Sequence, residues 1–538
     1  MNGQTVRGMP AIRHEVHFGQ RLVRCFTERP RSVHAMLAQA VARDPDGEAL
    51  VVGDRRWRWR EVDASTGRLA ASLSARGLQA GDRVVLLMSN RAEFVFTWFA
   101  ALRLGAIAVP VSIREQAPGL SYVIGQCGAA AIVYDDDLAD RLPAAADAPS
   151  LRDRLPASAA GALADGTGPG LEHAVPVAEE DTAVILYTSG TTGRPKGAML
   201  SHLGIVHSAM HYEHGMALDA RDRSIMAVPA SHVTGLVAMI ATMLRVGGAL
   251  VVVPQFKAGE FLALAARERI THTILVPAMY ALCLLAPDFD RYDLSAWRVG
   301  AYGGAPMPRA TIETLAARLP GMTLMNCYGS TETTSPATLM PAGEQAAHLE
   351  SVGRPMPCAD IVVVDDDGNE VPAGETGELL IGGPMVVRGY WDDPVASAAG
   401  FVAGHWRSGD LGSVDAEGYV RVFDRKKDMI NRGGYKIWSV EVENTLVGFA
   451  GVIEAAAVGV PCPVLGERVH AFVHMDAGAR AAAGEADALA EAMRRFCAER
   501  LADYKVPESI GLRDEPLPRN PNGKLLKREM RTWVSQTG

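Results

Sequence analysis

A glycine- and hydroxyl-rich stretch follows a short apolar run near residue 188. The run 183–187 predicts a buried strand, and the residues after it are those of a turn. Glycines let backbone N–H groups approach an oxyanion, hydroxyls add donors, and a lysine adds a mobile positive charge. An ordinary surface turn rarely gathers all three, so we predict a phosphate-binding stretch. Its candidate residues are Thr188, Ser189, Gly190, Thr191, Thr192, Gly193 and Lys196.

This stretch does not follow the P-loop pattern of the common NTPases. That pattern ends in Gly-Lys followed by Ser or Thr, whereas Lys196 is followed by Gly197. The Gly523-Lys524 pair is followed by Leu525 and fails the same test. We therefore expect a bound nucleotide without the usual NTPase loop.

Composition limits the class of protein. A chain of 538 residues, 48% hydrophobic and 21% charged, is typical of a globular protein with several domains. A net charge of −9 disfavours nucleic acid as a partner. We expect no secretory signal and no transmembrane segment. Seven scattered cysteines suggest reduced thiols and a cytoplasmic protein, and a homodimer is among the states left open.

Apolar runs alternate with helical patterns along the first 280 residues. This alternation predicts an α/β fold with parallel sheets and helical crossovers. Residues 152–180 are predicted to be a surface loop, 360–420 a small β-rich subdomain, and the segment beyond 426 a compact α+β tail. The expected strands are 84–88, 107–111, 131–134, 225–228, 249–253 and 274–276, and the expected helices are 92–104, 236–244, 260–268 and 486–501.

Further motifs follow the phosphate stretch in a fixed order. They are Asn-Cys-Tyr-Gly-Ser-Thr-Glu at 326–332, Trp-Arg-Ser-Gly-Asp at 406–410, Asp-Arg-Lys-Lys-Asp at 424–428 with Gly-Gly-Tyr-Lys at 433–436, and Pro-Asn-Gly-Lys at 521–524. Together they resemble the adenylate-forming superfamily, in its acyl-CoA and aryl-CoA synthetase branch. The resemblance implies an N-terminal AMP-binding domain over 1–424, with α/β subdomains and a β-rich subdomain. It also implies a small mobile C-terminal domain over 425–538.

The resemblance implies a two-step reaction. A carboxylic acid reacts with ATP and Mg²⁺ to an acyl-adenylate, and the acyl group then passes to a thiol such as that of CoA. Attack of a carboxylate on the α-phosphate brings two anions together, so the site must neutralise charge and orient the reactants. The phosphate stretch would hold the β- and γ-phosphates, Glu332 would be a catalytic residue and the metal ligand for Mg²⁺, and Thr331 would contact the α-phosphate.

The resemblance also assigns residues to the nucleoside of ATP. A glycine turn would leave room for the flat adenine, an aromatic ring would stack on it, and an acid with an arginine would bind the ribose hydroxyls. These residues are Gly303, Gly304, Ala305, Tyr328, Gly329, Asp410 and Arg425.

The C-terminal motifs are assigned to catalysis and domain movement. The Lys524 ammonium would bridge the attacking carboxylate and the α-phosphate. The resemblance places a hinge at Lys427, about which the small domain would rotate between the two half-reactions. Gly433 and Gly434 would line the thiol tunnel, where the bound arm leaves no room for a Cβ atom. A plain β-turn explains the two glycines about equally well.

The segment 229–236 resembles the border of the acid pocket, with His232 as the gate between carboxylate and thiol. Relatives commonly have Leu-Phe before this histidine, and here Ala230 and Ser231 occupy those positions, which leaves the pocket shape open. Amino-acid-activating members carry an Asp after the gate, where this chain has Val233. Because a buried ammonium would then be unpaired, we expect an apolar acid, with fatty, branched and aromatic acids all open.

Three histidines, His207, His211 and His214, have the spacing of one helix face. They do not predict a zinc site, because no carboxylate or cysteine completes a ligand set. We expect this face to border the acid pocket or to pack against a sheet.

The function that this reading favours is an ATP-dependent, AMP-forming ligase that joins a fatty or aryl acid to CoA. An enzyme that loads a carrier-protein phosphopantetheine is the near alternative, since it shares the first half-reaction. A catalytically idle nucleotide-binding protein is the alternative from another class. The combination of Lys196, Glu332, Asp410, Arg425 and Lys524 disfavours it, because a binding module would not need the last lysine.

Overall fold

The computed structural model of the 538-residue chain describes residues 8–188, 194–482, 484–519 and 525–535. The chain forms two compact units. The first comprises residues 1–362, 380–407 and 418–420, and the second comprises 363–379, 408–417 and 421–538. Within the described residues, no helix is both long enough and apolar enough to cross a lipid bilayer.

The first unit contains a six-stranded sheet. The two strands that flank the phosphate stretch lie at one edge of this sheet. All neighbouring strands are parallel except the β10–β9 pair at one edge, which is antiparallel. β5, β6 and β7 confirm three strands expected from the sequence. These strands were predictable because short runs of buried β-branched and aliphatic residues are typical of parallel strands. In spatial order the strands are β10 (Lys196–Ser201), β9 (Thr182–Thr188), β6 (Ile107–Pro110), β5 (Arg83–Leu87), β7 (Ala131–Tyr134) and β8 (Asp153–Pro156).

A nine-stranded sheet forms the other half of the first unit. Its central strands are parallel, and antiparallel strands close both edges. β11, β12 and β13 confirm the second group of strands expected from the sequence. In spatial order the strands are β17 (Arg354–Pro355), β16 (Thr338–Leu339), β15 (Thr323–Tyr328), β14 (Val299–Gly303), β13 (His272–Leu275), β11 (Arg223–Met226), β12 (Ala249–Val252), β3 (Glu48–Val52) and β4 (Arg55–Arg58).

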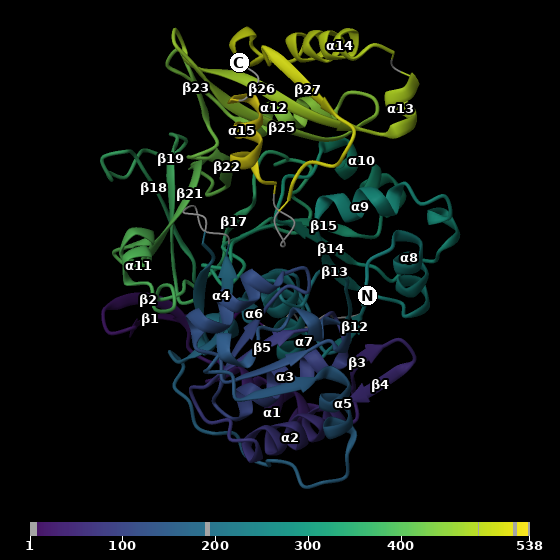
Figure 1. The fold of residues 1–538 in the computed structure, drawn as a ribbon, viewed down its shortest axis with the longest axis vertical. Helices are drawn as coiled ribbons and strands as arrows, with labels where there is room; N and C mark the ends of the chain where they lie inside the picture. Colours follow the sequence, from purple (N-terminus) through teal and green to yellow (C-terminus); the bar gives the residue numbers. More distant parts are fainter. Residues whose placement is uncertain (1–7, 189–193, 483, 520–524, 536–538) are drawn as a thin grey trace. The chain divides into compact units, whose positions relative to one another are not determined.

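Helices α1–α3, α5–α7 and α11 share one hydrophobic core with strands of both sheets, whereas α4 packs in a second cluster and α8–α10 pack in a third. Nearly all of α3 is buried, as expected for a helix packed on several sides, and Figure 1 shows it close to α1, α2 and β5. The helices are α1 (Val33–Arg43), α2 (Trp59–Ala75), α3 (Ala92–Arg103), α4 (Ala117–Cys127), α5 (Ala157–Asp165), α6 (His202–Gly215), α7 (Thr242–Val246), α8 (Ala258–Arg267), α9 (Pro277–Leu284), α10 (Arg309–Arg318) and α11 (Pro394–Gly400).

One local expectation from the sequence is wrong, and one expected helix is present but begins in π form. The predicted surface loop 152–180 contains strand β8 and helix α5. Small residues of α5, such as Ala160 and Ala164, are fully buried, so their Ala/Gly composition reflects close helix packing. The helix expected at 236–244 begins as a π-helix over Thr234–Ala241 and continues as α7. Gly235 permits this start, since a Cβ atom there would lie 2.2 Å from the Pro229 carbonyl oxygen.

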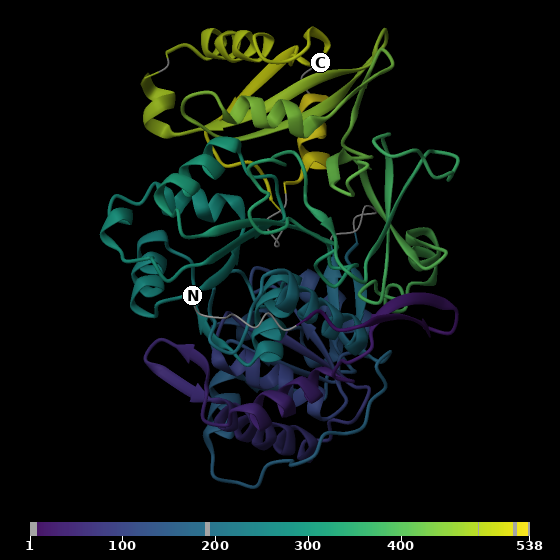
Figure 2. The ribbon, with the colours of Figure 1, turned by 180° about the vertical axis from the view of Figure 1, so that it is seen from behind.

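An N-terminal hairpin of β1 (Ile12–His17) and β2 (Arg21–Phe26) packs on the first unit. It lies beside α11 in both views of the fold (Figures 1 and 2). The Arg21 guanidinium fixes this arrangement by donating to the carbonyl oxygens of Val386, Val387 and Arg388, at 3.0–3.3 Å. The hairpin therefore supports the segment that precedes α11.

A five-stranded sheet accounts for the predicted β-rich subdomain. Its strands are β18 (Asp360–Val364), β19 (Gly377–Gly382), β21 (His405–Val414) and β20 (Phe401–Val402), with β22 (Val420–Arg425) paired to β21. The residues of this sheet belong partly to each unit.

The rest of the second unit is the compact α+β tail expected from the sequence. Helices α12 and α15 pack against β25, and α14 packs against β27 (Figure 1). The sheet contains β24 (Tyr435–Ile437), β23 (Ile430–Arg432), β26 (Gly466–Met475) and β25 (Val452–Cys462), with β27 (Ser509–Arg513) beside β26. The helices are α12 (Ser439–Val447), α13 (Ala477–Ala482), α14 (Ala486–Ala498) and α15 (Lys527–Ser535).

Cysteine chemistry agrees with the expectation of reduced thiols. All seven cysteines are free, and Cys462 alone among them is not buried. Burial raises the pKa of the Cys283 and Cys358 thiols to about 12, so these groups stay protonated. The six buried cysteines act as small apolar side chains of the interior.

Candidate functional site

The phosphate stretch joins two antiparallel strands at the edge of the six-stranded sheet. Thr188 ends β9, Lys196 begins β10, and these two residues face each other across the pair. The buried strand expected before the stretch is therefore found as β9. Of the predicted residues, Ser189, Gly190, Thr191, Thr192 and Gly193 lie outside the described residues.

Glu332 lies close to the start of this turn, although the two are far apart in the sequence. Its Oε1 accepts a hydrogen bond from the Thr188 hydroxyl at 3.3 Å, and its Oε2 accepts one from the Ser330 hydroxyl at 2.6 Å. The residue is 6% exposed, and its backbone oxygen accepts from the Val387 N–H at 2.9 Å. The carboxylate is thus held at a defined position beside the phosphate stretch.

Tyr390 is a third member of this cluster, and the sequence analysis missed it. Its hydroxyl donates to Glu332 Oε1 at 3.1 Å, and its ring centroid lies 5.2 Å from the Lys196 ammonium. Burial, with the Glu332 charge as the second cause, raises the pKa of Tyr390 far above its ordinary value. The hydroxyl therefore stays protonated as a donor. No local pattern marks this tyrosine, because the contact depends on the fold.

The predicted adenine turn follows β14. Gly303 pairs with Cys327 of β15, and a Cβ atom on Gly303 would lie 2.5 Å from the Cys327 carbonyl oxygen. Gly304 has φ of +79°, a conformation that favours glycine. The close approach of β15 and the turn geometry therefore already require glycines here. Ala305 is exposed, and Tyr328 is half-buried at the end of β15.

The segment after Tyr328 forms a tight turn that carries Thr331 and Glu332. The Ser330 N–H donates to the Thr333 hydroxyl at 2.9 Å, and that hydroxyl donates back to the Ser330 carbonyl oxygen at 3.1 Å. A Cβ atom on Gly329 would lie 3.1 Å from Pro336 Cα, so the chain passes itself closely at this point. Thr331 is half-buried beside the glutamate.

His232 lies in the loop between β11 and the π-helix. Its Nδ1 accepts from the Thr234 N–H at 3.3 Å and lies 3.2 Å from the Thr234 hydroxyl. The sequence analysis missed Asn90, which fixes this loop. The Asn90 side chain donates to the Val228 carbonyl oxygen at 3.0 Å and accepts from the Ala230 N–H at 2.8 Å. The signal available in the sequence was an asparagine directly after the apolar run 84–88. Buried amides need hydrogen-bond partners, so such a residue is a candidate for holding a neighbouring loop.

Within the second unit, the two residues predicted to bind ribose are paired. Arg425 Nε lies 2.6 Å from Asp410 Oδ1. Ser408 supports the pair, because its hydroxyl accepts from the Asp410 N–H at 2.9 Å and its carbonyl oxygen accepts from Arg425 at 3.3 Å. Asp410 is 4% exposed, so its carboxylate needs this pairing.

The other predicted residues of the second unit are Gly433, Gly434 and Lys524. The two glycines connect β23 and β24, with φ of +61° and +88°. A Cβ atom on Gly434 would meet nothing within 4 Å, so backbone geometry is the reason for glycine in this structure. Lys524 lies outside the described residues. The Arg531 guanidinium donates to the carbonyl oxygen of Lys427, the predicted hinge, at 3.1 Å.

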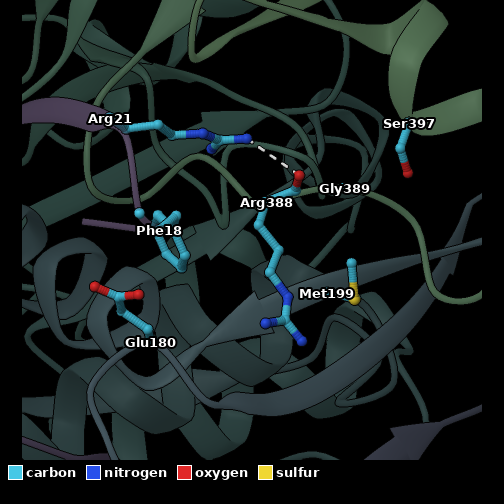
Figure 3. A pocket seen from close by; sticks show the side chains of 8 residues that line it. Phe18, Arg21, Glu180, Met199, Arg388, Gly389 and Ser397 are labelled. Atoms are coloured by element: carbon cyan, nitrogen blue, oxygen red, sulfur yellow. Dashed lines mark hydrogen bonds between the residues drawn. The ribbon is translucent and has the colours of Figure 1, made fainter. Parts of the chain in front are cut away.

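A cavity of about 470 Å³ lies beside the hairpin β1–β2 (Figure 3). Its lining includes Phe18, Arg21 and Met199, together with Arg388 and Gly389, and Figure 3 shows Arg21 donating to the Arg388 carbonyl oxygen. Among the residues that the structure describes, none of those assigned to a site from the sequence lines this cavity. It does not correspond to the acid pocket expected around 229–236.

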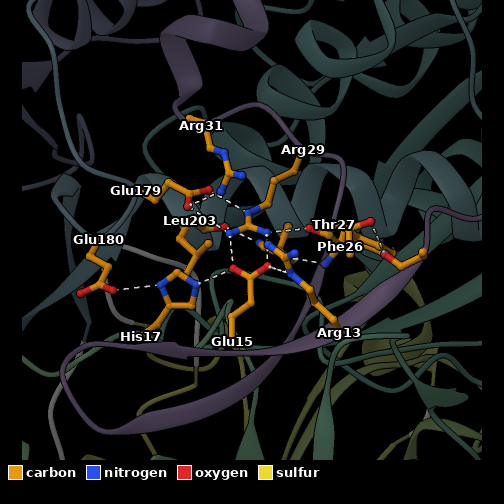
Figure 4. Close-up of polar contacts among 12 residues, drawn as sticks. Arg13, Glu15, His17, Phe26, Thr27, Arg29, Arg31, Glu179, Glu180 and Leu203 are labelled. Carbon is orange, nitrogen blue, oxygen red and sulfur yellow. Dashed lines mark hydrogen bonds and ion pairs between the residues drawn. The ribbon is translucent and has the colours of Figure 1, made fainter.

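A polar network at the hairpin β1–β2 contains the side-chain types that bind metals, but its charges disfavour a cation (Figure 4). Oxygen, nitrogen and sulfur atoms of Glu15, His17 and Cys25 lie within 4.8 Å of one another. The fully buried Arg29 guanidinium pairs with Glu15 at 2.7 Å and lowers the pKa of that carboxyl well below its usual range. Burial raises the pKa of Cys25 to about 12. A neutral thiol and an adjacent guanidinium disfavour a cation.

The three helical histidines pack around Phe26. His207 stacks on its ring, donates from Nδ1 to the Leu203 carbonyl oxygen at 2.9 Å, and accepts from the Phe26 N–H at 3.2 Å. His211 meets the same ring edge-on, and neither of its nitrogens has a hydrogen-bond partner among the residues that the structure describes. Burial lowers the pKa of His207 to about 4. This face packs in the core, which is one of the two expected outcomes.

Comparisons with known proteins identify the family of the chain. The chain matches the AMP-binding enzyme family over residues 37–391 and the AMP-binding enzyme C-terminal domain over 441–524. It is 33% identical to a long-chain-fatty-acid–CoA ligase of Mycobacterium tuberculosis, over 94% of this chain and 99% of the relative. It is 35% identical to a feruloyl-CoA synthase of an Amycolatopsis species, over 90% and 96% of the two chains.

A solved structure shows the same fold. The o-succinylbenzoate CoA synthetase of Bacillus subtilis, in complex with its acyl-adenylate intermediate, superposes with a TM-score of 0.83 at 27% identity. The match covers 94% of this chain and 98% of that one. The chain therefore belongs to the AMP-binding enzyme family, as an adenylate-forming enzyme of the acyl-CoA and aryl-CoA synthetase branch.

Proposed function

We propose that this enzyme activates an apolar carboxylic acid, fatty or aromatic, as its adenylate and transfers the acyl group to CoA. The observation that carries the proposal is the cluster of Thr188, Lys196 and Glu332 in the first unit. It combines a hydroxyl donor, a cation and a fixed carboxylate at the end of a strand, which is the chemistry that a metal-bound triphosphate needs.

The residues present fit a magnesium ion. Mg²⁺ prefers oxygen ligands in a regular geometry and is commonly bound through one or two carboxylates together with substrate phosphates. Glu332 offers a carboxylate whose two oxygens are already oriented by Ser330, Thr188 and Tyr390. When bound, the ion would neutralise charge on the phosphates. In this proposal Glu332 holds the metal, and Thr188 and Lys196 bind the β- and γ-phosphates.

The nucleoside residues complete the proposed binding of ATP. Asp410, paired with Arg425, accepts hydrogen bonds from the ribose hydroxyls, and Arg425 adds a donor. Tyr328 stacks on the adenine, and the turn 303–305 borders it. Thr331 donates to the α-phosphate, where the new bond forms.

Lys524 and His232 have proposed roles around the acid. The Lys524 ammonium offsets the repulsion between the attacking carboxylate and the α-phosphate during the first half-reaction. His232 gates the passage between the carboxylate and the thiol. With Nδ1 accepting from the Thr234 N–H, the neutral ring carries its proton on Nε2, which is then a donor. The C-terminal segment 425–538 moves about Lys427 between the half-reactions, and residues 433–434 contact the arm of CoA.

The choice of an apolar acid rests on the residue after the gate. Val233 is 4% exposed and offers no charge to an α-amino group. Ligases for a long-chain fatty acid and for ferulate are both among the relatives.

The test is a panel of carboxylic acids, each incubated with the enzyme, ATP, Mg²⁺ and CoA. The measured quantity is the rate of AMP formation. We expect AMP release with fatty or aryl acids and little with α-amino acids. A parallel series replaces CoA by a phosphopantetheinylated carrier protein, because an enzyme that loads a carrier would show higher kcat/KM with that acceptor. No acid-dependent AMP formation with any acceptor would refute the proposed function.

A further inference from the structure

The buried Tyr390 lies between the two charged groups of the candidate phosphate site. Its hydroxyl donates to Glu332 Oε1 at 3.1 Å, and its ring faces the Lys196 ammonium at 5.2 Å. The ring is 8% exposed and packs against Phe401, with 5.7 Å between the centroids. A single side chain thus contacts the proposed metal carboxylate and the proposed phosphate-binding lysine.

The backbone of Tyr390 is fixed to the strand that begins at Lys196. Tyr390 forms an antiparallel bridge with Ala198, the Trp391 N–H donates to the Gly197 carbonyl oxygen at 2.7 Å, and the Met199 N–H donates to the Gly389 carbonyl oxygen at 3.2 Å. Residues 389–391 therefore extend along β10. This register places the Tyr390 ring near the first residue of the strand.

A second support comes from α11. The Tyr390 N–H donates to the Ser397 hydroxyl at 2.9 Å, and Asp393 caps the same helix by accepting from the Ala396 N–H at 2.9 Å. Figure 3 shows Gly389, the residue before Tyr390, and Ser397 at the wall of the neighbouring cavity. The tyrosine is consequently held from both sides, and its hydroxyl has a defined direction.

We propose that Tyr390 is a positioning residue that orients Glu332 for Mg²⁺ and holds Lys196 for the phosphates of ATP. This inference rests on the proposed function, and it assigns separate tasks to the two parts of the side chain. The hydroxyl orients the carboxylate, because an ionised carboxylate accepts hydrogen bonds and directs its remaining lone pairs to a metal. The ring holds the ammonium through a cation–π contact.

The two tasks can be separated by two substitutions. Tyr390→Phe keeps the ring and removes the hydroxyl, whereas Tyr390→Leu removes both. The matched control is Tyr280→Phe, because the Tyr280 hydroxyl is also buried and donates to a backbone oxygen, that of Ala301, at 3.0 Å. Loss of a buried hydroxyl is then common to the test and control variants.

The first readout is metal binding without turnover. Mn²⁺, which uses the same oxygen ligands, is titrated by electron paramagnetic resonance in the presence of α,β-methylene ATP. Loss of a residue that orients a metal ligand typically weakens metal affinity by about 10- to 100-fold. We expect that loss for Tyr390→Phe and no change for Tyr280→Phe. Equal affinities for the wild type and Tyr390→Phe would overturn the proposal.

The second readout separates the ring from the hydroxyl. Pyrophosphate binding without metal should be nearly unchanged in Tyr390→Phe and weaker in Tyr390→Leu by roughly two- to fivefold, the size of an exposed to partly buried cation–π contact. If both variants lose the same affinity for pyrophosphate, the role assigned to the ring is wrong.

A double-mutant cycle distinguishes positioning from general destabilisation. In a Glu332→Gln background, Tyr390→Phe should cause no further loss of Mn²⁺ affinity, because its effect passes through the carboxylate. An equal further loss in that background would refute the inference. A wild-type enzyme that binds Mn²⁺ and nucleotide but never forms AMP would contradict only the proposed function.

Discussion

Within the second unit, the Arg425 guanidinium and the Asp410 carboxylate form an ion pair, with 2.6 Å between Nε and Oδ1. The pair joins β22 to β21 and involves an aspartate whose side chain is 5% exposed. A buried carboxylate in a fixed orientation is suited to accept two neighbouring hydroxyls. The pair therefore holds Asp410 in the orientation that its proposed role in ribose binding requires.

Removing the charge of Asp410 should weaken nucleotide binding. We expect Asp410→Asn to raise the dissociation constant for ATP by roughly 10- to 100-fold, because hydrogen bonds to a charged group contribute about 1.5–3 kcal/mol. Isothermal calorimetry with ATP checks this. Asp366→Asn is the control, since Asp366 is 80% exposed and pairs with Lys426 at 2.8 Å. Similar losses in both variants would argue against a ribose role.

Glu332→Gln should stop the first half-reaction. The amide keeps the size of the side chain but loses the charge that the metal needs, so we expect acid-dependent ATP–pyrophosphate exchange to fall by about 100-fold or more. Excess Mg²⁺ should restore part of the rate. The control is Glu378→Gln, another carboxylate with a buried side chain, in the second unit. Normal exchange by Glu332→Gln would exclude it as the metal ligand.

Lys524→Ala should separate the two half-reactions, a prediction that rests on the sequence. Adenylation should be abolished, while thioester formation from a supplied acyl-adenylate should stay largely intact, because the second step does not need that ammonium. Lys505→Ala, which removes a cation paired with Glu441 at 2.6 Å, is the control and should retain both steps. Normal adenylation by Lys524→Ala would show that another group balances the charge.

Lys427→Pro should slow one half-reaction far more than the other. Proline fixes φ and restricts the preceding residue, so the backbone cannot take two conformations at this point. Lys427→Ala is the control, because it removes the side chain and keeps the backbone freedom. The Lys427 carbonyl oxygen, which accepts from Arg531, is present in both variants. Pyrophosphate exchange and thioester formation are measured separately, and equal slowing of both would contradict domain alternation.

The buried histidines of α6 should make the fold sensitive to acid. Burial lowers the pKa of His207 to about 4, from an ordinary value of 6.5. Between these values the unfolded chain binds more protons than the folded one, so the free energy of unfolding decreases as the pH falls through this window. The same direction holds for His211. Urea unfolding at pH 7.5 and pH 5 measures the effect.

Two leucine variants test the assignment. His211→Leu removes two buried nitrogens without partners, so we expect a gain of about 1 kcal/mol at pH 7.5 and a weaker dependence on acid. His207→Leu leaves the Phe26 N–H without its acceptor, and it should lower stability by about 1–3 kcal/mol at pH 7.5. Identical effects of the two substitutions would show that their hydrogen bonds do not decide stability.

The sequence by itself determined the family, the α/β class and many of the strands and helices, and it supplied the candidate residues. Short apolar runs and helical patterns act over a few neighbouring positions, so β5 and α3 are readable locally. Local patterns failed where packing decides. α5 was predicted to be loop, because its small residues form a helix face only when other helices cover them.

Only the tertiary structure decided which distant groups meet. Tyr390 contacts Glu332 across 58 residues, and Asn90 holds Ala230 across 140, because sheet topology sets these neighbours. The structure also supplied the reasons for particular glycines. Gly433 and Gly434 have positive φ in a hairpin turn. At Gly303 a Cβ atom would clash with the Cys327 carbonyl oxygen. A sequence shows which residues could do the chemistry, and the fold decides which of them act together.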